Sequence, residues 1–280
     1  MNANGHNALK PDLARLVEVR DMAPEIKFMR VELLNGSADR YRTYQPGQFA
    51  FLSAFGVGEA PFGLASIPSD TLGLEFAVQR LGAVTTELHE LGQGDLVGVR
   101  GPLGNCFPME QFKGRDILVL GGGIGGAPLR PVLQSIFARR AEYGRLTILW
   151  AARRPDLLIF REEYAAWRKQ PDTTLHLTVD EPDAGWQGEV GLITQLLEKL
   201  APCAQNTIAI TCGPPVMIYY ADKSLQKLGF QPEQSYVTLE ARMHCGIGKC
   251  GRCNLGEKLI CVDGPVFSMA EVGHLLESFL

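Results

Sequence analysis

The chain has 280 residues, of which 46% are hydrophobic and 21% are charged, with a formal net charge of −4. This length predicts two domains with room for a small appendage, and the composition is that of an ordinary soluble globular protein. The weak negative charge gives no electrostatic reason to expect a nucleic-acid partner. Residues 1–12 are polar, unlike a signal peptide, and no run reaches the ~20 apolar residues of a membrane span. We therefore expect a cytoplasmic protein.

The first hundred residues alternate apolar and polar side chains between glycines and prolines, as half-buried strands do. The candidate strands are Leu13–Val19, Ile26–Leu34, Gln48–Leu52, Leu74–Gln79 and Asp95–Val99. Thr85–Leu91 is the one candidate helix in this part. Several short strands with one helix predict an antiparallel β-barrel domain over residues 1–113.

The pattern changes after Lys113. Candidate strands at Asp116–Leu120, Leu146–Ala151, Leu175–Val179 and Thr207–Thr211 alternate with candidate helices at 128–143, 162–170 and 192–200. Alternation of this kind predicts a Rossmann-like α/β domain with a parallel sheet over residues 114–235. Residues 236–280 are rich in glycine and cysteine and too poor in apolar residues for a core, so we expect a small lobe that folds around a metal.

Four of the seven cysteines lie within 17 residues of this lobe. Cys245, Cys250, Cys253 and Cys261 have the spacing C-x4-C-x2-C-x7-C, and the first three match the plant-type loop that holds a 2Fe–2S cluster. Gly246, Gly248 and Gly251 let the backbone wrap closely, and nearby basic residues could offset the cluster's negative charge: Arg242, Lys249, Arg252 and Lys258. A four-thiolate zinc site and a set of disulfides are the alternatives.

A glycine-rich turn follows the apolar strand Ile117–Leu120 and leads into a helix. The candidate nucleotide-binding residues there are Gly121, Gly122, Gly123, Ile124, Gly125, Gly126 and Pro128. Glycines let a pyrophosphate approach the backbone and the helix N-terminus. A second turn ends a later strand and contributes Cys212, Gly213, Pro214 and Met217. Two such turns at strand carboxyl ends predict a ligand crevice, whereas each alone could be a tight strand–helix connection.

These motifs together resemble the ferredoxin–NADP reductase superfamily. The segment Leu239–Cys253 with Cys261–Phe267 is similar to the gamma subunits of cytoplasmic NiFe hydrogenases (sulfhydrogenases) and to the B subunit of anaerobic sulfite reductase. More distantly it resembles the electron-transfer subunit of dihydroorotate dehydrogenase and the small subunit of bifurcating transhydrogenases. The resemblance implies an N-terminal barrel that binds FAD, a central domain that binds NAD(P), and a lobe whose 2Fe–2S cluster passes single electrons to another subunit.

In this superfamily the flavin lies against an Arg-x-Tyr-Ser-like strand, which Ala60–Ser66 matches with Ala60 in place of the arginine and Gly63-Leu64 in place of Tyr-Ser. The implied flavin contacts there are Phe62, Gly63, Leu64, Ala65 and Ser66. A second segment implies Val78, Gln79, Arg80, Gly82, Val84 and Thr85, where a helix begins and its free N–H groups can take the FAD pyrophosphate. Barrel core and an ordinary helix start are the alternatives for the two segments. Gly101–Asn105 resembles the loop that closes the barrel.

Arg153 and Arg154 follow a strand where a reductase of this type reaches the adenosine ribose, so they could pair with a 2′-phosphate or be solvated charges, and NAD versus NADP stays open. Cys212 corresponds to the nicotinamide end of relatives. None of the five histidines is expected to be catalytic, and His89 and His176 are expected on the surfaces of a helix and a strand.

The sequence therefore predicts a diaphorase-like subunit that moves electrons between NAD(P)H, FAD, a 2Fe–2S cluster and a partner subunit. A cytoplasmic NiFe hydrogenase is the preferred partner. The same module could serve a sulfite reductase, a dihydroorotate dehydrogenase or a bifurcating transhydrogenase. A hypothesis of a different class is a nucleotide-binding module that senses redox state through zinc or a labile cluster.

Overall fold

The computed structural model describes residues 7–34, 37–68 and 73–279, so part of the polar segment 1–12 lies outside the described residues. The chain divides into two compact units. The first comprises Met1–Phe107 and Glu240–Pro265, and the second comprises Pro108–Leu239 and Val266–Leu280. The cysteine-bearing stretch thus folds with the N-terminal sheet, whereas the last residues of the expected lobe return to the α/β unit.

The first unit is built on a six-stranded sheet in the order β4-β3-β6-β1-β2-β5. Its strands are β1 Asp12–Ala23, β2 Ile26–Leu33, β3 Phe49–Ala54, β4 Gly58–Gly63, β5 Gly73–Gln79 and β6 Leu96–Leu103, with the helix α1 Ala83–Glu90 and the 3-10 turn η1 Ser37–Tyr41. All neighbouring strands run antiparallel. The predicted antiparallel barrel-like domain is therefore confirmed, and a cluster that includes Leu16, Leu52 and Phe76 forms part of its buried core.

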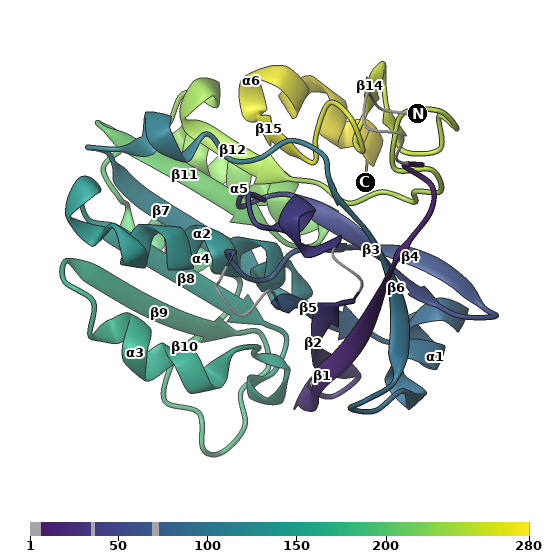
Figure 1. Ribbon diagram of the computed structural model, residues 1–280. Helices are drawn as coiled ribbons and strands as arrows, with labels where there is room; N and C mark the ends of the chain where they lie inside the picture. Colours follow the sequence, from purple (N-terminus) through teal and green to yellow (C-terminus); the bar gives the residue numbers. More distant parts are fainter. Residues whose placement is uncertain (1–6, 35–36, 69–72, 280) are drawn as a thin grey trace. The chain divides into compact units, whose positions relative to one another are not determined.

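The second unit is built on a seven-stranded sheet in the order β10-β9-β8-β7-β11-β12-β15 (Figure 1). Its strands are β7 Asp116–Gly122, β8 Leu146–Ala152, β9 Thr173–Val179, β10 Glu189–Val190, β11 Thr207–Cys212, β12 Ser235–Thr238 and β15 Val266–Ser268. The α-helices are α2 Gly126–Ala138, α3 Tyr164–Arg168, α4 Ile193–Leu200, α5 Pro215–Lys227 and α6 Met269–Val272. The 3-10 turns are η2 Met109–Phe112, η3 Gly123–Gly125, η4 Arg140–Glu142, η5 Pro155–Leu157, η6 Arg161–Glu163, η7 Pro232–Gln234 and η8 Gly273–Phe279.

The predicted parallel sheet is confirmed from β10 to β12. The edge strand β15 pairs antiparallel with β12, so the sheet is mixed. Helices cover both faces. Leu149 of β8 belongs to a core cluster with residues of α4 and α5, while its neighbour Trp150 packs edge-on against Trp167 of α3 with ring centroids 5.2 Å apart. Successive strand residues point to opposite faces, which places α3 across the sheet from α4 and α5.

Two expectations from the sequence need correction. The helix expected over 128–143 ends at Ala138, because Arg139 leaves the helical conformation and the turn η4 follows. The surface position expected for His89 is wrong: its side chain is buried, and its Nε2 lies 2.8 Å from the carbonyl oxygen of Val78. α1 packs against β5, so the polar ring is satisfied by a strand-end carbonyl rather than by water. His176 on β9 is half-buried.

The cysteine stretch Glu240–Pro265 connects β12 to β15. Its regular secondary structure consists of two short strands, β13 Asn254–Leu255 and β14 Lys258–Leu259. We call this stretch the cysteine module. Its far end is fixed to the barrel: the backbone N–H of Asn105 donates to the carbonyl of Gly264 at 2.7 Å, and the Asn105 side chain donates to the carbonyl of Asp263 at 2.9 Å. Separately, none of the helices in the described ranges is long and apolar enough to cross a membrane.

Candidate functional site

The two glycine turns predicted from the sequence meet in the second unit. β7 and β11 are parallel neighbours with Gly121 opposite Cys212, so their carboxyl ends lie at one edge of the sheet. A Cβ on Gly125 would lie 2.6 Å from the backbone nitrogen of Gly213 and 2.7 Å from the carbonyl carbon of Cys212. Strand order reverses between β7 and β11, and open α/β sheets bind ligands at such a switch point.

The side chain of Met217, in the first turn of α5, packs over both turns. A Cβ on Gly213 would lie 2.8 Å from the Met217 sulfur, and one on Gly122 would lie 3.0 Å from its methyl carbon. By contrast, Gly123 has φ +56° and open space where its Cβ would be. The N-cap residue of α2 is Gly125, which has no side chain that could cap the helix. A glycine with open space at its Cβ position, next to a helix start with no N-cap side chain, suits a phosphate group.

Trp150 explains two of the three glycines in the formal G-x-G-x-x-G pattern. A Cβ on Gly121 would lie 2.7 Å from the indole ring, and one on Gly126 would lie 2.9 Å from it. These glycines therefore make room for a buried tryptophan of β8, which donates its ring N–H to the carbonyl of Ile159 at 3.3 Å. The sequence analysis did not predict that these glycines make room for Trp150. The signal that could have indicated it is a tryptophan within the apolar strand that follows the glycine-rich one.

Arg153 and Arg154 follow β8 at the same edge of the sheet, and each is paired with a carboxylate. Arg153 bonds to Glu181 at 3.1 Å, and Arg154 bonds to Asp156 at 3.0 Å. The Arg153 side chain is 72% exposed. Exposed ion pairs contribute little stability, so a ligand phosphate could displace Glu181 from Arg153.

In the first unit, the stretch 62–66 divides into accessible and buried residues. Phe62 at the end of β4 is half-buried and packs edge-on against Phe76, with ring centroids 6.5 Å apart, and Gly63 is also half-buried. Leu64 and Ala65 are buried, and Ser66 is buried with its hydroxyl 2.8 Å from that of Tyr44. The Leu64 side chain belongs to the barrel core, so Phe62 and Gly63 are the residues of this stretch that a ligand can reach.

The second flavin segment forms the turn into α1. The hydroxyl oxygen of Thr85 accepts the backbone N–H groups of Leu81 at 2.8 Å and Gly82 at 2.9 Å, so Thr85 shapes the turn. Arg80 is exposed, and its Nε and Nη2 donate to the two carboxylate oxygens of Glu25. The Leu81 side chain, which the sequence analysis did not single out, is 81% exposed. The other residues named here are less accessible: Val78 is buried, and Gln79 and Val84 are half-buried.

The four clustered cysteines form two pairs of contacting thiols. Cys245 is hydrogen-bonded to Cys250, and Cys261 is hydrogen-bonded to Cys253. In the described parts of the chain, no three or more His, Cys, Asp or Glu side chains are grouped as the ligands of one metal ion. Two pairs of thiols match instead the two thiolates that each iron of a 2Fe–2S cluster needs. The donor set present therefore fits such a cluster.

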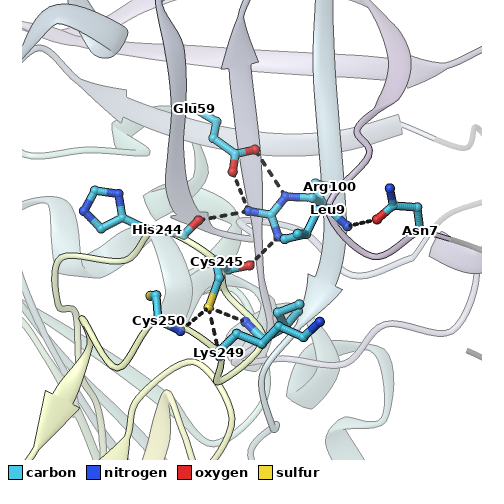
Figure 2. Close-up of polar contacts among 9 residues, drawn as sticks. Asn7, Leu9, Glu59, Arg100, His244, Cys245, Lys249 and Cys250 are labelled. Atoms are coloured by element: carbon cyan, nitrogen blue, oxygen red, sulfur yellow. Dashed lines mark hydrogen bonds and ion pairs between the residues drawn. The ribbon is translucent and has the colours of Figure 1, made fainter. Parts of the chain in front are cut away.

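Backbone N–H groups gather on the sulfur of Cys245 (Figure 2). The donors are Ile247 at 3.5 Å, Lys249 at 3.2 Å and Cys250 at 3.3 Å. Burial raises the pKa of the Cys245 thiol, but these N–H groups and the Cys250 thiol outweigh it and lower the pKa to about 7. Glycines at positive φ, such as Gly246 at +68° and Gly248 at +76°, produce this wrapped backbone.

The second pair is more enclosed. Cys253 and Cys261 are buried, and burial raises the pKa of the Cys261 thiol to about 12 despite the N–H of Gly248, which donates to its sulfur at 3.2 Å. A metal bound here would have to displace the thiol protons. His244 turns its carbonyl toward Arg100 and its ring away from the Cys245 sulfur (Figure 2).

An antiparallel barrel-like unit carrying a cysteine module, together with an α/β unit whose glycine turns meet at a switch point, defines a pyridine-nucleotide oxidoreductase with an iron–sulfur segment. Residues 119–223 match the oxidoreductase NAD-binding domain family, and residues 240–273 match the iron–sulfur cluster binding domain of dihydroorotate dehydrogenase B.

Two curated relatives share most of their length with this chain. Sulfhydrogenase 1 subunit gamma of Pyrococcus furiosus is 39% identical over 236 residues, covering 82% of this chain and 81% of the relative. A Methanocaldococcus jannaschii chain named "Probable dihydroorotate dehydrogenase B (NAD(+)), electron transfer subunit" is 32% identical over 260 residues, covering 92% and 90%.

Among solved structures, a chain of the NADH-dependent reduced ferredoxin–NADP oxidoreductase superposes with a TM-score of 0.77 at 26% identity, covering 98% of this chain and 93% of that chain. The chain belongs to the family of sulfhydrogenase gamma subunits and dihydroorotate dehydrogenase B electron-transfer subunits, within the ferredoxin–NADP reductase superfamily. The resemblance and the oxidoreductase class predicted from the sequence are thereby confirmed.

Proposed function

We propose that this chain is the electron-transfer subunit of a cytoplasmic redox complex, moving electrons between NAD(P)H and a partner catalytic subunit by way of bound FAD and a 2Fe–2S cluster. NAD(P)H gives up two electrons and a proton together as a hydride. The chain must therefore convert one two-electron donation into two single-electron deliveries. When bound, a flavin accepts the hydride and an iron–sulfur cluster carries one electron at a time.

The observation that carries this proposal is the paired arrangement of the four thiols. Two pairs, Cys245 with Cys250 and Cys253 with Cys261, supply two thiolates for each of two irons. A one-electron carrier in a chain with a nucleotide-binding unit makes sense only if its electron goes to another protein. Lys249, Cys250 and Arg252 are exposed, so the module presents part of its surface outward, where a partner could dock.

The nucleotide is proposed to bind at the switch point of the second unit. The pyrophosphate is proposed to lie at Gly123, whose Cβ position is open, and at the start of α2, whose N-cap residue has no side chain. Cys212 and Pro214 stand at the end of β11 for the nicotinamide. Arg153 is the candidate contact for the ribose side. The remaining turn residues, Gly121, Gly122, Gly125, Gly126, Ile124, Gly213 and Met217, shape the crevice.

The flavin is proposed to bind the first unit at Phe62 and Gly63 and at the turn from Arg80 to Thr85. These are the positions of the two predicted segments that are accessible in the structure. The chain of the flavin-based bifurcating oxidoreductase noted above has the same fold over nearly its whole length, which supports a flavin here.

The preferred partner is a NiFe hydrogenase. Two sulfhydrogenase gamma subunits of Pyrococcus furiosus, 39% and 33% identical, support this assignment. Dihydroorotate dehydrogenase is the second candidate, supported by the match of the cysteine module to the iron–sulfur domain of its B protein. Co-purification from the native source distinguishes them: a hydrogenase partner confers H2-dependent reduction of NAD(P)+, whereas a dehydrogenase partner confers dihydroorotate-dependent reduction.

The isolated chain tests the proposal without a partner. We expect purified protein to contain two irons and two acid-labile sulfides per chain, with one FAD, as a plant-type cluster and one flavin require. A chain that binds zinc in place of iron, or that contains no flavin, would contradict the proposal and favour the redox-sensing alternative.

A further inference from the structure

Arg100 of β6 is a buried cation that contacts the first residues of the cysteine module. Its side chain is 2% exposed, and it lies over the ring of Phe51 with 4.1 Å from the guanidinium carbon to the ring centroid. On one side it bonds to the Glu59 carboxylate of β4 at 2.5 and 3.2 Å. On the other it donates to the carbonyl of Cys245 at 2.8 Å (Figure 2). One guanidinium therefore links the barrel to the backbone of a cluster ligand.

This arrangement needs an explanation beyond barrel stability. Burying a charged side chain is costly unless its donors are all satisfied, and a well-packed apolar residue often serves a core as well or better. Here the guanidinium donates hydrogen bonds to Glu59, to the carbonyl of Cys245 at 2.8 Å and to the carbonyl of His244 at 3.4 Å. Two successive carbonyls of the module are thus held by one planar fork, a geometry that lysine cannot reproduce.

The residue after the ligand is fitted to the same barrel surface. Gly246 is buried at φ +68°, and a Cβ there would lie 2.6 Å from the Phe51 ring, 3.0 Å from the Leu103 side chain and 3.3 Å from the Arg100 Nη1. The backbone at Cys245 and Gly246 is therefore pressed onto the barrel. The next turn of this same backbone directs its N–H groups at the Cys245 sulfur.

We propose that Arg100 is a positioning residue for the iron–sulfur cluster: it anchors the Cys245 loop to the barrel and, with Glu59, sets the charge beside that ligand. This inference rests on the proposed function, because it needs the cluster that the function assigns to the four cysteines. The pair then acts in two ways. It fixes the backbone that donates to the Cys245 sulfur, and its two opposite charges bias the cluster's reduction in opposite directions.

The opposite charges of Arg100 and Glu59 predict the direction in which each substitution shifts the reduction potential of the cluster. Adding an electron to the cluster adds negative charge, which a nearby cation stabilises and a nearby anion opposes. Glu59→Gln leaves Arg100 uncompensated and should raise the reduction potential, whereas Arg100→Met leaves Glu59 uncompensated and should lower it. At an effective dielectric of about 20, removing one unit charge roughly 12 Å from the cluster changes the reduced-to-oxidised ratio at fixed potential by about tenfold. For a one-electron couple that ratio corresponds to about 59 mV.

The experiment compares wild type, Glu59→Gln and Arg100→Met as full-length purified chains, measuring iron and sulfide content, the EPR spectrum of the reduced cluster and its midpoint potential. Arg130→Met is the matched control. Arg130 is also buried, pairs with Glu163 at 2.7 Å and lies 4.9 Å from the Phe160 ring, but it belongs to the second unit. Its loss should leave the potential of the cluster unchanged.

Opposite shifts in Glu59→Gln and Arg100→Met, with none in Arg130→Met, would support the inference. If Arg100→Met does not fold or loses its cluster, Glu59→Gln decides, because Glu59 is 30% exposed on the edge strand β4 and its amide is nearly isosteric. A loaded Glu59→Gln protein with the potential and EPR spectrum of wild type overturns the inference. Wild-type protein without iron and sulfide instead refutes the proposed function itself.

Discussion

Substituting Gly125 tests whether the meeting of the two glycine turns forms the nucleotide site. In Gly125→Ala the new methyl group would lie 2.6 Å from the Gly213 nitrogen and 2.7 Å from the Cys212 carbonyl carbon. Because ordinary contacts of this kind begin at 3.4 Å, the two turns must separate by roughly 0.8 Å, the difference between 3.4 and 2.6 Å. Both contacts are to backbone, which cannot rotate away as a side chain can.

The expected size of the effect follows from overpacking. Forcing an extra methyl group into a packed site costs about 1–3 kcal/mol. If separation of the turns spoils the pyrophosphate cradle, that cost appears in binding as a loss of roughly 5- to 150-fold in affinity for NAD(P)H. The cysteine module belongs to the other unit, so its iron and sulfide content should not change.

The measurement is the dissociation constant for NADH and NADPH by calorimetric titration, together with the thermal midpoint. Gly185→Ala is the matched control in the same unit, since its Cβ would meet no atom closer than the Asp183 carboxylate oxygen at 3.6 Å. A folded Gly125→Ala protein that binds nucleotide as tightly as Gly185→Ala would refute the assignment of the site to these turns.

Three further outcomes are expected. Cys253→Ser should lower iron and sulfide content severalfold because it removes one thiolate of the buried pair, whereas serine at the exposed Cys203 should not; equal contents would contradict the ligand assignment. Glu181→Gln should lower the KM for NADPH relative to NADH by a few fold, since it frees Arg153 for a 2′-phosphate and removes a repelling carboxylate; an unchanged ratio in steady-state assays would exclude Arg153 from that contact. Trp150→Ala should lower the unfolding free energy by about 3–5 kcal/mol in urea titrations, and a loss below about 1 kcal/mol would contradict its role as the packing partner of the glycine strand.

The strongest sequence predictions about the site are those that rest on residue spacing alone. The C-x4-C-x2-C-x7-C spacing led to four cysteine ligands, and in the structure Cys245 pairs with Cys250 and Cys253 with Cys261. The turns after β7 and β11 were expected at one edge of a parallel sheet, and Gly125 does lie against Gly213. Strand periodicity and glycine placement are local signals, so they are readable without the fold.

What the sequence did not reveal depends on contacts between distant segments. The sequence analysis assigned no role to Arg100, and only the fold brings it to Cys245, 145 positions away. The surface position expected for His89 was wrong because the periodicity of a helix does not reveal its distant partners. The partner here is the carbonyl of Val78. The antiparallel return of β15 beside β12 was likewise hidden, because three residues are too few to show a period.

The most direct test of the account is an anaerobic titration of the isolated chain with NADH and, separately, NADPH, monitored by visible absorption and EPR. The account predicts that at least one nucleotide bleaches a flavin spectrum and that the EPR signal of a reduced 2Fe–2S cluster then grows in the same sample. Protein that contains both cofactors but shows neither change with either nucleotide would contradict the claim that this chain passes electrons between NAD(P)H and an iron–sulfur cluster.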